Sequence, residues 1–573
     1  MKRFLVDKKN SAKQKIRSAK HNWHGIFASL YLRESAVVVL LFLIISISLA
    51  TIYLKQLGIY FNQSPVSGGT YTEGIVGQPQ SLNPLYSQGS SVDRSIVSLV
   101  YSGLVKIDKH GEIKPDLAES WDISEDKTKY TIHLKKNAFW HDGDQVLSED
   151  ILFTYSVTQD PDYTGPLKDQ FKDVSIEAPD DFTIIFIDTK KDINFINKLT
   201  LGILPQHRWA TSLVSDIPYL EQNLTPIGSG IFSFKNASTD ESGKIINITL
   251  ERNNRFYSDK PYIESIILKF YQNDQEIKNA LTKKEIDGSA DIDSTSYRDL
   301  ENINRLRFYS YPESGYKAIF FNQDKSQLLA NKEIRKIFYL SINKAAIENE
   351  LYKKAKISHD AFNDYREPLD QNKNIEEAKI ILSTLQAKDD NNDGILELNG
   401  GKITFALSIN SDEESKTVAK IIKENLKQLG IEILVEEKNS TEFERDVLSP
   451  RNYQLVLLGQ NYGANKNLYP FWHSTQLKSP GLNFSQVTSK RIDVLLENYL
   501  VKTDSEEKQK ILETINKIIL EENYAVFLYK PIYVYATDKK IKGLTKNYFT
   551  FPENRFIEIE KWYINSKWSF RFN

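Results

Sequence analysis

One uninterrupted apolar segment constrains this chain more than any other feature of its sequence. Residues Ala36–Leu54 are nineteen in a row without a charged side chain. As an α-helix this segment would be about 28 Å long, close to the roughly 30 Å hydrocarbon core of a bilayer. No other apolar run in the sequence is as long without a charge. The sequence therefore predicts one membrane-spanning helix.

The charge on either side of this segment predicts its orientation. Residues 1–34 contain nine Lys or Arg and two acids, a net charge of +7, whereas the rest of the 573-residue chain carries −9. Because basic residues favour the cytosolic side, we expect a cytosolic tail over 1–34, an anchor over 35–60 and all later residues outside the cytoplasmic membrane. A cleaved signal peptide is the alternative, with Ser48–Ala50 as its cleavage site, although the apolar run of such a peptide usually has roughly 7–15 residues.

The composition of the remaining chain is that of a folded protein with several domains. Hydrophobic residues make up 40% of the chain and aromatic residues 12%, enough to form large cores. Cysteine is absent, which excludes disulfides, iron–sulfur clusters, thiolate zinc sites and cysteine nucleophiles. The sequence also lacks a Gly-x-Ser-x-Gly elbow, a Gly-Lys-Ser/Thr phosphate loop and a His-Glu-x-x-His motif. We therefore expect no enzyme, no cofactor and no nucleic-acid partner.

A β-α-β unit is the clearest local pattern. Apolar residues alternate along Lys402–Asn410, as in a strand buried on one face. Ser411–Glu414 has the spacing of a capping box, and Val418–Leu429 places its apolar residues on one helical face. Gly430 follows at the C-terminal cap position, and Ile431–Val435 predicts the next strand. The sequence thus predicts an α/β domain with a partly parallel sheet.

Two further segments contain candidate functional residues. The Pro- and Gly-containing residues 61–69 predict a linker. The acidic turn at 389–397 resembles part of an EF-hand loop, but Gly400 stands where the bidentate Glu of such a loop belongs. We interpret it as a turn before the next strand, with calcium binding as the alternative. Its candidate ligands are Asp389, Asn391, Asp393 and Glu397.

A polar and aromatic loop follows the predicted strand Tyr453–Leu458. Ligands bind beyond the carboxyl ends of strands in α/β sheets, and binding sites combine aromatic walls with a few amides. The loop therefore predicts a binding surface, with Tyr462 and Trp472 either as its walls or as core residues. The candidate contacts are Gln460, Asn461, Tyr462, Asn465, Trp472 and His473.

Several motifs together resemble a known family, the bacterial extracellular solute-binding proteins of family 5, which are peptide receptors of ABC importers. The strongest match is Leu117–Tyr155, which contains Ala-x-Ser-Trp and, after a strand, Trp-x-Asp-Gly. The resemblance extends from about Thr70 to about Trp562. The other matching segments are Gly77–Pro84, Val100–Asp108, Pro226–Phe234, Arg252–Tyr257, Ile334–Lys344 and Gly481–Asn498.

This resemblance implies a type II periplasmic-binding-protein-like fold that closes on its ligand. It implies lobe I over 70–320 with a subdomain at about 112–224, lobe II over 321–529, and a return to lobe I over 530–573. It also suggests ligand contacts at Tyr101, at Ser229 in a Gly-Ser-Gly turn and at Tyr316 near the crossover.

The function implied is that of a membrane-anchored receptor that captures a peptide or similar solute and delivers it to an ABC permease. A sensor or chaperone without an importer, or a surface hydrolase, are the alternatives. The chain departs from the family in Gly463–Leu468, which lacks the carboxylate that would meet a peptide's ammonium group. A helix also replaces the lipidated cysteine that many members carry.

Overall fold

The computed structural model describes residues 32–56, 59–168, 170–190, 195–361, 371–463, 467–502, 504–545 and 549–572. The chain forms two compact units. Unit 1 comprises the N-terminal residues through Val66 together with the C-terminal residues from Asn565, and unit 2 comprises Ser67–Ile564. The predicted basic tail lies outside the described residues up to position 31.

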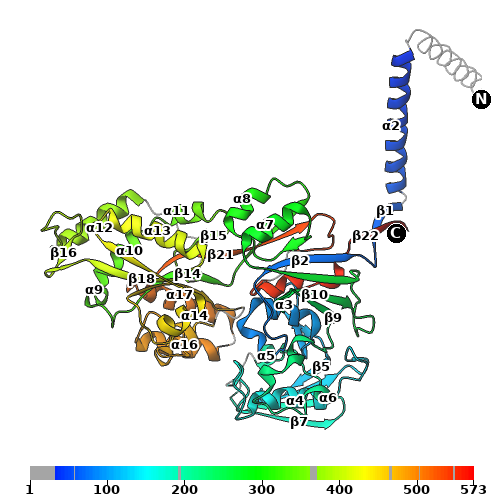
Figure 1. Cartoon of the computed structure of the whole chain (residues 1–573), viewed down its shortest axis with the longest axis horizontal. Helices are drawn as coiled ribbons and strands as arrows, with labels where there is room; N and C mark the ends of the chain where they lie inside the picture. The colour runs from blue at the N-terminus through cyan, green and yellow to red at the C-terminus, as the bar shows by residue number, and fades with distance from the viewer. Residues whose placement is uncertain are drawn as a thin grey trace, which may run out of the picture. The chain divides into compact units, whose positions relative to one another are not determined.

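Unit 1 contains helix α2 (Leu32–Gln56), within which Ala36–Tyr53 is long and apolar enough to cross a membrane. After it, strand β1 (Ile59–Val66) pairs antiparallel with β22 (Asn565–Phe572) near the C-terminus (Figure 1). Part of the predicted linker, residues 61–66, is therefore a strand. Its hydrogen-bonding partner lies about five hundred residues away along the chain, so local composition gives no sign of the pairing.

Within the described residues, unit 2 is built on a twelve-stranded mixed sheet. The long strand β21 (Ala525–Asp538) lies in its middle and pairs antiparallel with β12, β13, β14 and β15. In sheet order the main path is β19 (Glu432–Lys438), β18 (Thr404–Asn410), β20 (Leu455–Asn461), β14 (Gly315–Phe321), β21, β12 (Gly288–Ser289), β2 (Thr70–Val76), β11 (Ser265–Tyr271), β10 (Ile245–Arg252) and β9 (Phe232–Thr239), while β13 (Leu306–Pro312) and β15 (Ala355–Ile357) pair with β21 beside it.

Helices cover both faces of the β19–β14 half of this sheet (Figure 1). Alternate residues of β14 enter different cores: Ile319 and Phe321 pack into one, and Phe320 packs into the other. This alternation follows from the two-residue period of a strand. The covering helices are α10 (Lys332–Ser341), α11 (Lys344–Glu350), α12 (Gln371–Thr384) and α13 (Glu413–Lys427) on one face, and α16 (Lys490–Val501) and α17 (Ser505–Glu521) on the other.

The predicted β-α-β unit is confirmed. Strand β18 pairs in parallel with β19 through Thr404↔Glu432, and α13 connects them. The predicted helix start is wrong by one residue. The N-cap is Asp412, whose carboxylate accepts the backbone N–H of Ser415, whereas Ser411 lies before the cap. Gly430 has the left-handed φ of +70° expected just beyond a helix end.

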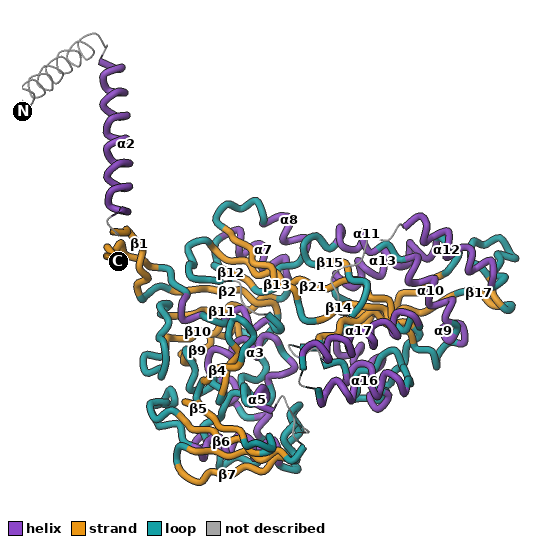
Figure 2. The backbone as a smooth tube through the Cα atoms, turned by 180° about the vertical axis from the view of Figure 1, so that it is seen from behind, coloured by secondary structure: helices purple, strands orange, loops and turns teal. Residues whose placement is uncertain are grey.

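The other half of unit 2 contains a second, four-stranded antiparallel sheet (Figure 2). It shares one large core with helices α3 (Ser91–Val100) and α4 (Ser148–Gln159) and with the β2–β9 end of the main sheet. Helices α7 (Asp274–Lys283) and α8 (Ser294–Leu300) enclose a smaller core. The strand order of the second sheet is β5 (Ala118–Ile123), β6 (Lys129–Leu134), β8 (Thr183–Asp188), β7 (Val174–Asp180).

The predicted lobe boundaries at residues 320 and 529 stay predictions. Strand β14 pairs with β20 from Gly315 onward, several residues before the predicted boundary, and β21 continues through the predicted boundary at 529. The main sheet is therefore continuous across both boundaries, and the pairing of strands marks no break at either residue.

Candidate functional site

A cleft of about 1170 Å³ in unit 2 is the candidate site. One wall is formed by the end of α3, by the β3–β4 hairpin (Val105–Ile107 and Ile113–Pro115) and by residues 197–202. The C-terminal segment 551–560 lies on another side, and residues 167–171 and 256–259 also contribute. The lining residues between the end of β20 and the end of α16 are Tyr462, Gly463, Asn467, Leu500 and Val501.

Tyr101 and Tyr462 are the two predicted contacts that line this cleft. Tyr101 is the C-cap residue of α3, with extended backbone angles that end the helix. Burial raises the pKa of Tyr101, so its phenol stays protonated at neutral pH and can donate a hydrogen bond. Tyr462 follows β20, and its backbone N–H donates to the carbonyl of Ser314 at 2.9 Å. Each of these two tyrosines is thus the first residue after a helix or a strand, which fixes its position in the cleft wall.

The predicted Gly-Ser-Gly turn packs against the end of α3, next to Tyr101. The N–H of Gly230 donates to the carbonyl of Val100 at 2.8 Å, and a Cβ on Gly228 would lie only 2.0 Å from that oxygen. Glycine is required here because the turn packs directly against the end of α3. Ser229 is fully buried and lies outside the lining of the cleft. Its predicted ligand contact stays untested, and this geometry favours a supporting role.

His141 fixes the same turn through both ring nitrogens. Burial lowers its pKa from 6.5 to about 4, so the ring is neutral at physiological pH. Nδ1 accepts the N–H of Gly228 at 3.2 Å, which leaves the proton on Nε2 to donate to the carbonyl of Gly230 at 3.0 Å. A charged ring could not accept from Gly228, so the neutral form is required.

Three predicted contacts form a buried network outside the cleft lining. The hydroxyl of Tyr316 donates to Oε1 of Gln460 at 2.7 Å, and Nε1–H of Trp472 donates to the same hydroxyl at 3.2 Å. All three side chains are at most 4% exposed. Their polar atoms are therefore satisfied inside the protein, and Trp472 is a core residue. Ligand contact by these residues stays a prediction that this geometry does not support.

The other predicted residues of the loop have separate positions. Asn461 donates from Nδ2 to the carbonyl of Thr550 at 3.0 Å, which joins the end of β20 to the C-terminal segment. His473 is buried away from the cleft lining, stacks on Tyr469 with 4.1 Å between ring centroids, and bonds Thr475 through Nδ1. Asn465 lies outside the described residues.

Sequence reasoning missed an ion pair in the cleft wall. Nε of Arg94 donates to Oε1 of Glu553 at 3.0 Å, and the guanidinium lies 5.7 Å from the ring centroid of Phe551. Oε2 of Glu553 is buried and accepts no hydrogen bond from the protein. The two partners are 459 residues apart in sequence, so no local motif could have revealed them.

A second, fully buried ion pair fixes the segment that carries Glu553. Arg555 donates from Nη2 and Nε to Oε1 of Glu73 on β2, at 2.6 and 2.9 Å. It also donates to Ser95 on α3 and to the carbonyl of Pro552. Both charged side chains are 0% exposed. The C-terminal wall of the cleft is therefore attached to β2 and α3 by charge-assisted hydrogen bonds.

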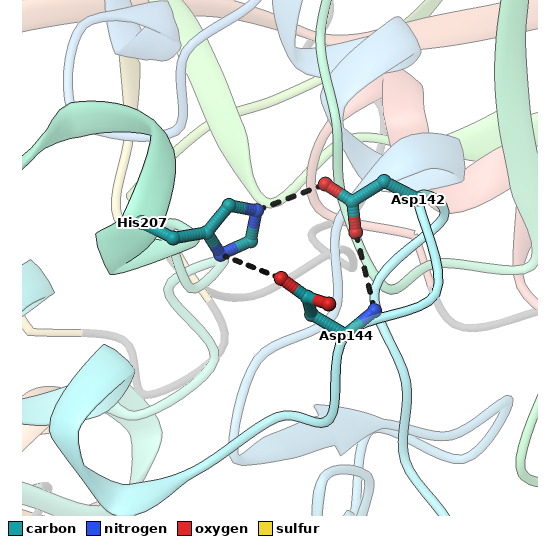
Figure 3. Close-up of side chains that lie close together, drawn as sticks. All are labelled: Asp142, Asp144 and His207. Atoms are coloured by element: carbon teal, nitrogen blue, oxygen red, sulfur yellow. Dashed lines mark hydrogen bonds and ion pairs between the residues drawn. The ribbon is translucent and has the colours of Figure 1, made fainter.

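Among the residues that the structure describes, two groups of side chains have the composition of a cation site. On the surface, His207 lies between two carboxylates, with Nε2 2.9 Å from Asp142 and Nδ1 3.9 Å from Asp144 (Figure 3). At the predicted acidic turn, oxygens of Asp389, Asp393 and Glu397 also lie close together.

The structure places that turn before the hairpin of β16 (Glu397–Leu398) and β17 (Gly401–Lys402), away from the cleft. Asp389 accepts the backbone N–H groups of Asp393 and Gly394, and Glu397 accepts from Asn391. Asp393 forms an ion pair with Lys402. These bonds fit our interpretation as a structural turn, and calcium binding stays untested.

Comparison with known proteins places this geometry in a family. The model of the bacterial extracellular solute-binding proteins, family 5 middle region, matches residues 112–479. The oligopeptide-binding protein AppA of Bacillus subtilis is 28% identical over 522 residues, which cover 87% of this chain and 92% of that protein.

Solved structures agree with the family match. The structure of AppA from Bacillus subtilis in complex with a nonapeptide superimposes with a TM-score of 0.72 at 27% identity, covering 88% of this chain and all of that one. The ABC transporter substrate-binding protein CtaP from Listeria monocytogenes gives a TM-score of 0.73 at 25% identity, covering 87% and 99%. The fold is thus the two-lobed α/β fold of these binding proteins, as the sequence predicts.

Proposed function

This chain belongs to the bacterial extracellular solute-binding proteins of family 5, a family of non-enzymes that serve ABC transporters, and from that membership we propose that it is a membrane-anchored peptide receptor. It captures a peptide between its lobes and delivers it to an ABC permease. The observation that carries this proposal is the cleft lined by Tyr101 on one side and Tyr462 on the other.

The size and lining of the cleft support a peptide ligand. Its volume of about 1170 Å³ exceeds the roughly 300–1,000 Å³ typical of sites for drug-sized molecules. The relative from Bacillus subtilis is named an oligopeptide-binding protein and was solved with a nonapeptide. Aromatic side chains such as Tyr101 and Tyr462 offer flat contact area with few rotatable bonds, which suits ligands of varied sequence.

The ammonium group of a peptide needs an acid, because an unpaired buried charge is costly. The loop Gly463–Leu468 offers none. We propose that Glu553 takes this role, since it lines the cleft and only its Oε1 is engaged by Arg94. A ligand ammonium beside Glu553 would complete a cation–carboxylate–cation arrangement, and the fixed position of Arg555 would preorganise it.

Helix α2 supports the anchored state. It is continuous over 25 residues, and the basic tail before it favours a cytosolic N-terminus. We therefore propose that residues 1–60 are retained as an uncleaved anchor and that unit 2 functions outside the cell membrane. N-terminal sequencing of the mature protein tests this point, because a start near residue 50 would show cleavage of a signal peptide.

Mass spectrometry of the purified full-length protein tests the ligand class. We expect co-purified peptides, and calorimetry with one of them should show binding weakened by Tyr462→Ala and by Glu553→Gln. Tyr219→Ala is the matched control, because Tyr219 is 86% exposed and lies outside the cleft lining. Equal affinities in all folded variants would place the ligand elsewhere.

Uptake measurements separate a receptor from a sensor or chaperone. Cells that lack this protein should lose uptake of the labelled peptide, and the wild-type gene should restore it. Normal uptake without the protein would favour the sensor or chaperone.

A further inference from the structure

We propose that a contact between helix α8 and the end of helix α11, on the face of the main sheet opposite the cleft, opposes closure of the cleft and lowers its affinity for ligand. This inference rests on the proposed function, because it assumes that the cleft closes on a peptide. It gives residues outside the binding site a role in setting how tightly that site binds.

Each half of unit 2 has a core on each face of the main sheet. Val534 of β21 packs into the core of α7 and α8, and its neighbour Tyr533 packs into the core of α3. In β14, Phe321 packs into the core of α11, and its neighbour Phe320 packs into the core of α16. Neighbours along a strand point to opposite faces. In both views α8 and α11 therefore lie on one side of β21, and α3 and α16, which line the cleft, lie on the other (Figures 1 and 2).

The side chains of Arg298, Glu301, Tyr352 and Lys353 form the back contact between the two halves. Nη2 of Arg298 on α8 donates to the carbonyls of the last two residues of α11, at 3.0 and 3.1 Å. These carbonyls have no partner within their own helix. Glu301, the C-cap residue of α8, accepts from the hydroxyl of Tyr352 at 2.7 Å and from Nζ of Lys353 at 3.0 Å. The guanidinium of Arg298 also lies 5.1 Å from the ring centroid of Tyr352.

The hinge lies between the cleft and the back contact. The chain passes from one half to the other at Glu313 and returns along β21. The backbone N–H of Glu313 donates to the carbonyl of Pro531 in β21 at 3.0 Å, so the two passages are adjacent. On the cleft side, the N–H of Tyr462 donates to the carbonyl of Ser314 at 2.9 Å. On the other side, the carbonyl of Lys354, the residue after the back contact, accepts from β21 at 2.7 Å.

The back contact is made while the cleft is open. Val501 and Phe551 line the cleft from its two sides, yet they are 74% and 44% exposed. Rotation about a hinge moves its two sides in opposite directions. Closing the cleft therefore draws α8 away from α11 and breaks the bonds between them. A contact made only in the open state stabilises that state, so ligand binding has to overcome it.

Distances between two spin labels across the cleft test the inference in the full-length protein. The chain has no cysteine, so Glu112→Cys and Val494→Cys carry the only labels. Both positions are exposed and lie outside the cleft lining, one between β3 and β4 and the other on α16. After exhaustive dialysis and without added peptide, the variant Arg298→Met/Glu301→Gln should show shorter distances than wild type. Identical distance distributions would overturn the inference.

Calorimetry measures the same effect as an affinity. The probe is a synthetic copy of a peptide that co-purifies with the protein. We expect the folded variant Arg298→Met/Glu301→Gln to bind this peptide about 3–10-fold more tightly than wild type, because only its open state loses polar contacts. Unchanged or weaker binding would contradict the proposed role of the back contact.

Lys278→Met is the matched control. Its Nζ pairs with Oδ2 of Asp299 at 2.6 Å, which joins α7 to α8 within one half. This variant should change neither distance nor affinity, and a shift equal to that of the double variant would overturn the inference. Lys353→Gln, whose side chain is 49% exposed, repeats the test if the double variant does not fold. Failure of the proposed function gives a different result, because wild type would then bind no peptide while the labels still report whether the back contact holds the cleft open.

Discussion

Removing Arg555 should destabilise unit 2 by about 3–5 kcal/mol, the usual cost of leaving one partner of a buried ion pair alone. In Arg555→Met, the carboxylate of Glu73 would stay fully buried and lose the two donors on Oε1. It would keep the hydroxyls of Tyr71 and Tyr535 at 2.7 and 2.9 Å, which places the expected loss near the lower end of that range.

The pKa of Arg555 agrees with this reasoning in its direction. Burial alone would lower the pKa of the guanidinium, but the adjacent Glu73 carboxylate and the nearby Tyr533 and Tyr535 outweigh burial and raise it. The surroundings of Arg555, with Glu73 as the main favourable partner, therefore stabilise its charged form in the folded state. The double variant Glu73→Leu/Arg555→Met should be more stable than Arg555→Met, because it removes both charges together.

Urea unfolding monitored by tryptophan fluorescence measures these differences. Arg445→Met is the matched control, since its ion pair with Asp446 is 66% and 44% exposed and should contribute less than about 1 kcal/mol. A loss below about 1 kcal/mol in Arg555→Met, or a double variant less stable than the single one, would refute the reasoning.

Three further predictions concern the cleft, the acidic turn and the pH response. Tyr462→Ala should weaken peptide binding by about 1–3 kcal/mol in calorimetry through lost apolar contact, and an unchanged affinity would exclude Tyr462 from the site. Calcium should leave peptide affinity unchanged, because the turn at Asp393 lies outside the cleft lining; a calcium-dependent affinity would contradict this. Burial lowers the pKa of His141 from 6.5 to about 4, so its stabilising contribution is complete above pH 6.5 and is lost as the pH falls toward 4. Between pH 7 and pH 5 the stability advantage of wild type over His141→Asn should shrink by about 2 kcal/mol in urea unfolding, and a constant difference would show that His141 titrates normally.

Local periodicity predicted the parts of the fold in which neighbours in sequence are neighbours in space. The β18–α13–β19 unit follows from alternation, helical spacing and Gly430. The predicted helix start was wrong by one residue because Ser411 and Asp412 can both cap a helix. The structure shows that the Asp412 carboxylate accepts the backbone N–H of Ser415. The pairing of β1 with β22 had no local signal, since it joins segments about 500 residues apart in the sequence.

The candidate site, like the fold, was predicted only where local sequence carries a signal. Tyr101, predicted through the family motif, and Tyr462, predicted at the end of a strand, both line the cleft, and their contact with a ligand stays a prediction. Trp472 has the same composition signal as Tyr462, but its indole N–H is satisfied internally by Tyr316, which allows complete burial. Sequence alone cannot distinguish a polar aromatic that faces a ligand from one whose partner is another buried side chain.

The buried contact between Glu73 and Arg555 also sets a time scale for biosynthesis. The two residues are 482 positions apart, and a ribosome adds about 5–20 residues per second. Roughly 25–100 s therefore pass between the synthesis of Glu73 and that of Arg555. During that interval Glu73 lacks the guanidinium with which it is fully buried in the folded chain. We therefore expect the core around Glu73 to form only after Arg555 has been synthesised.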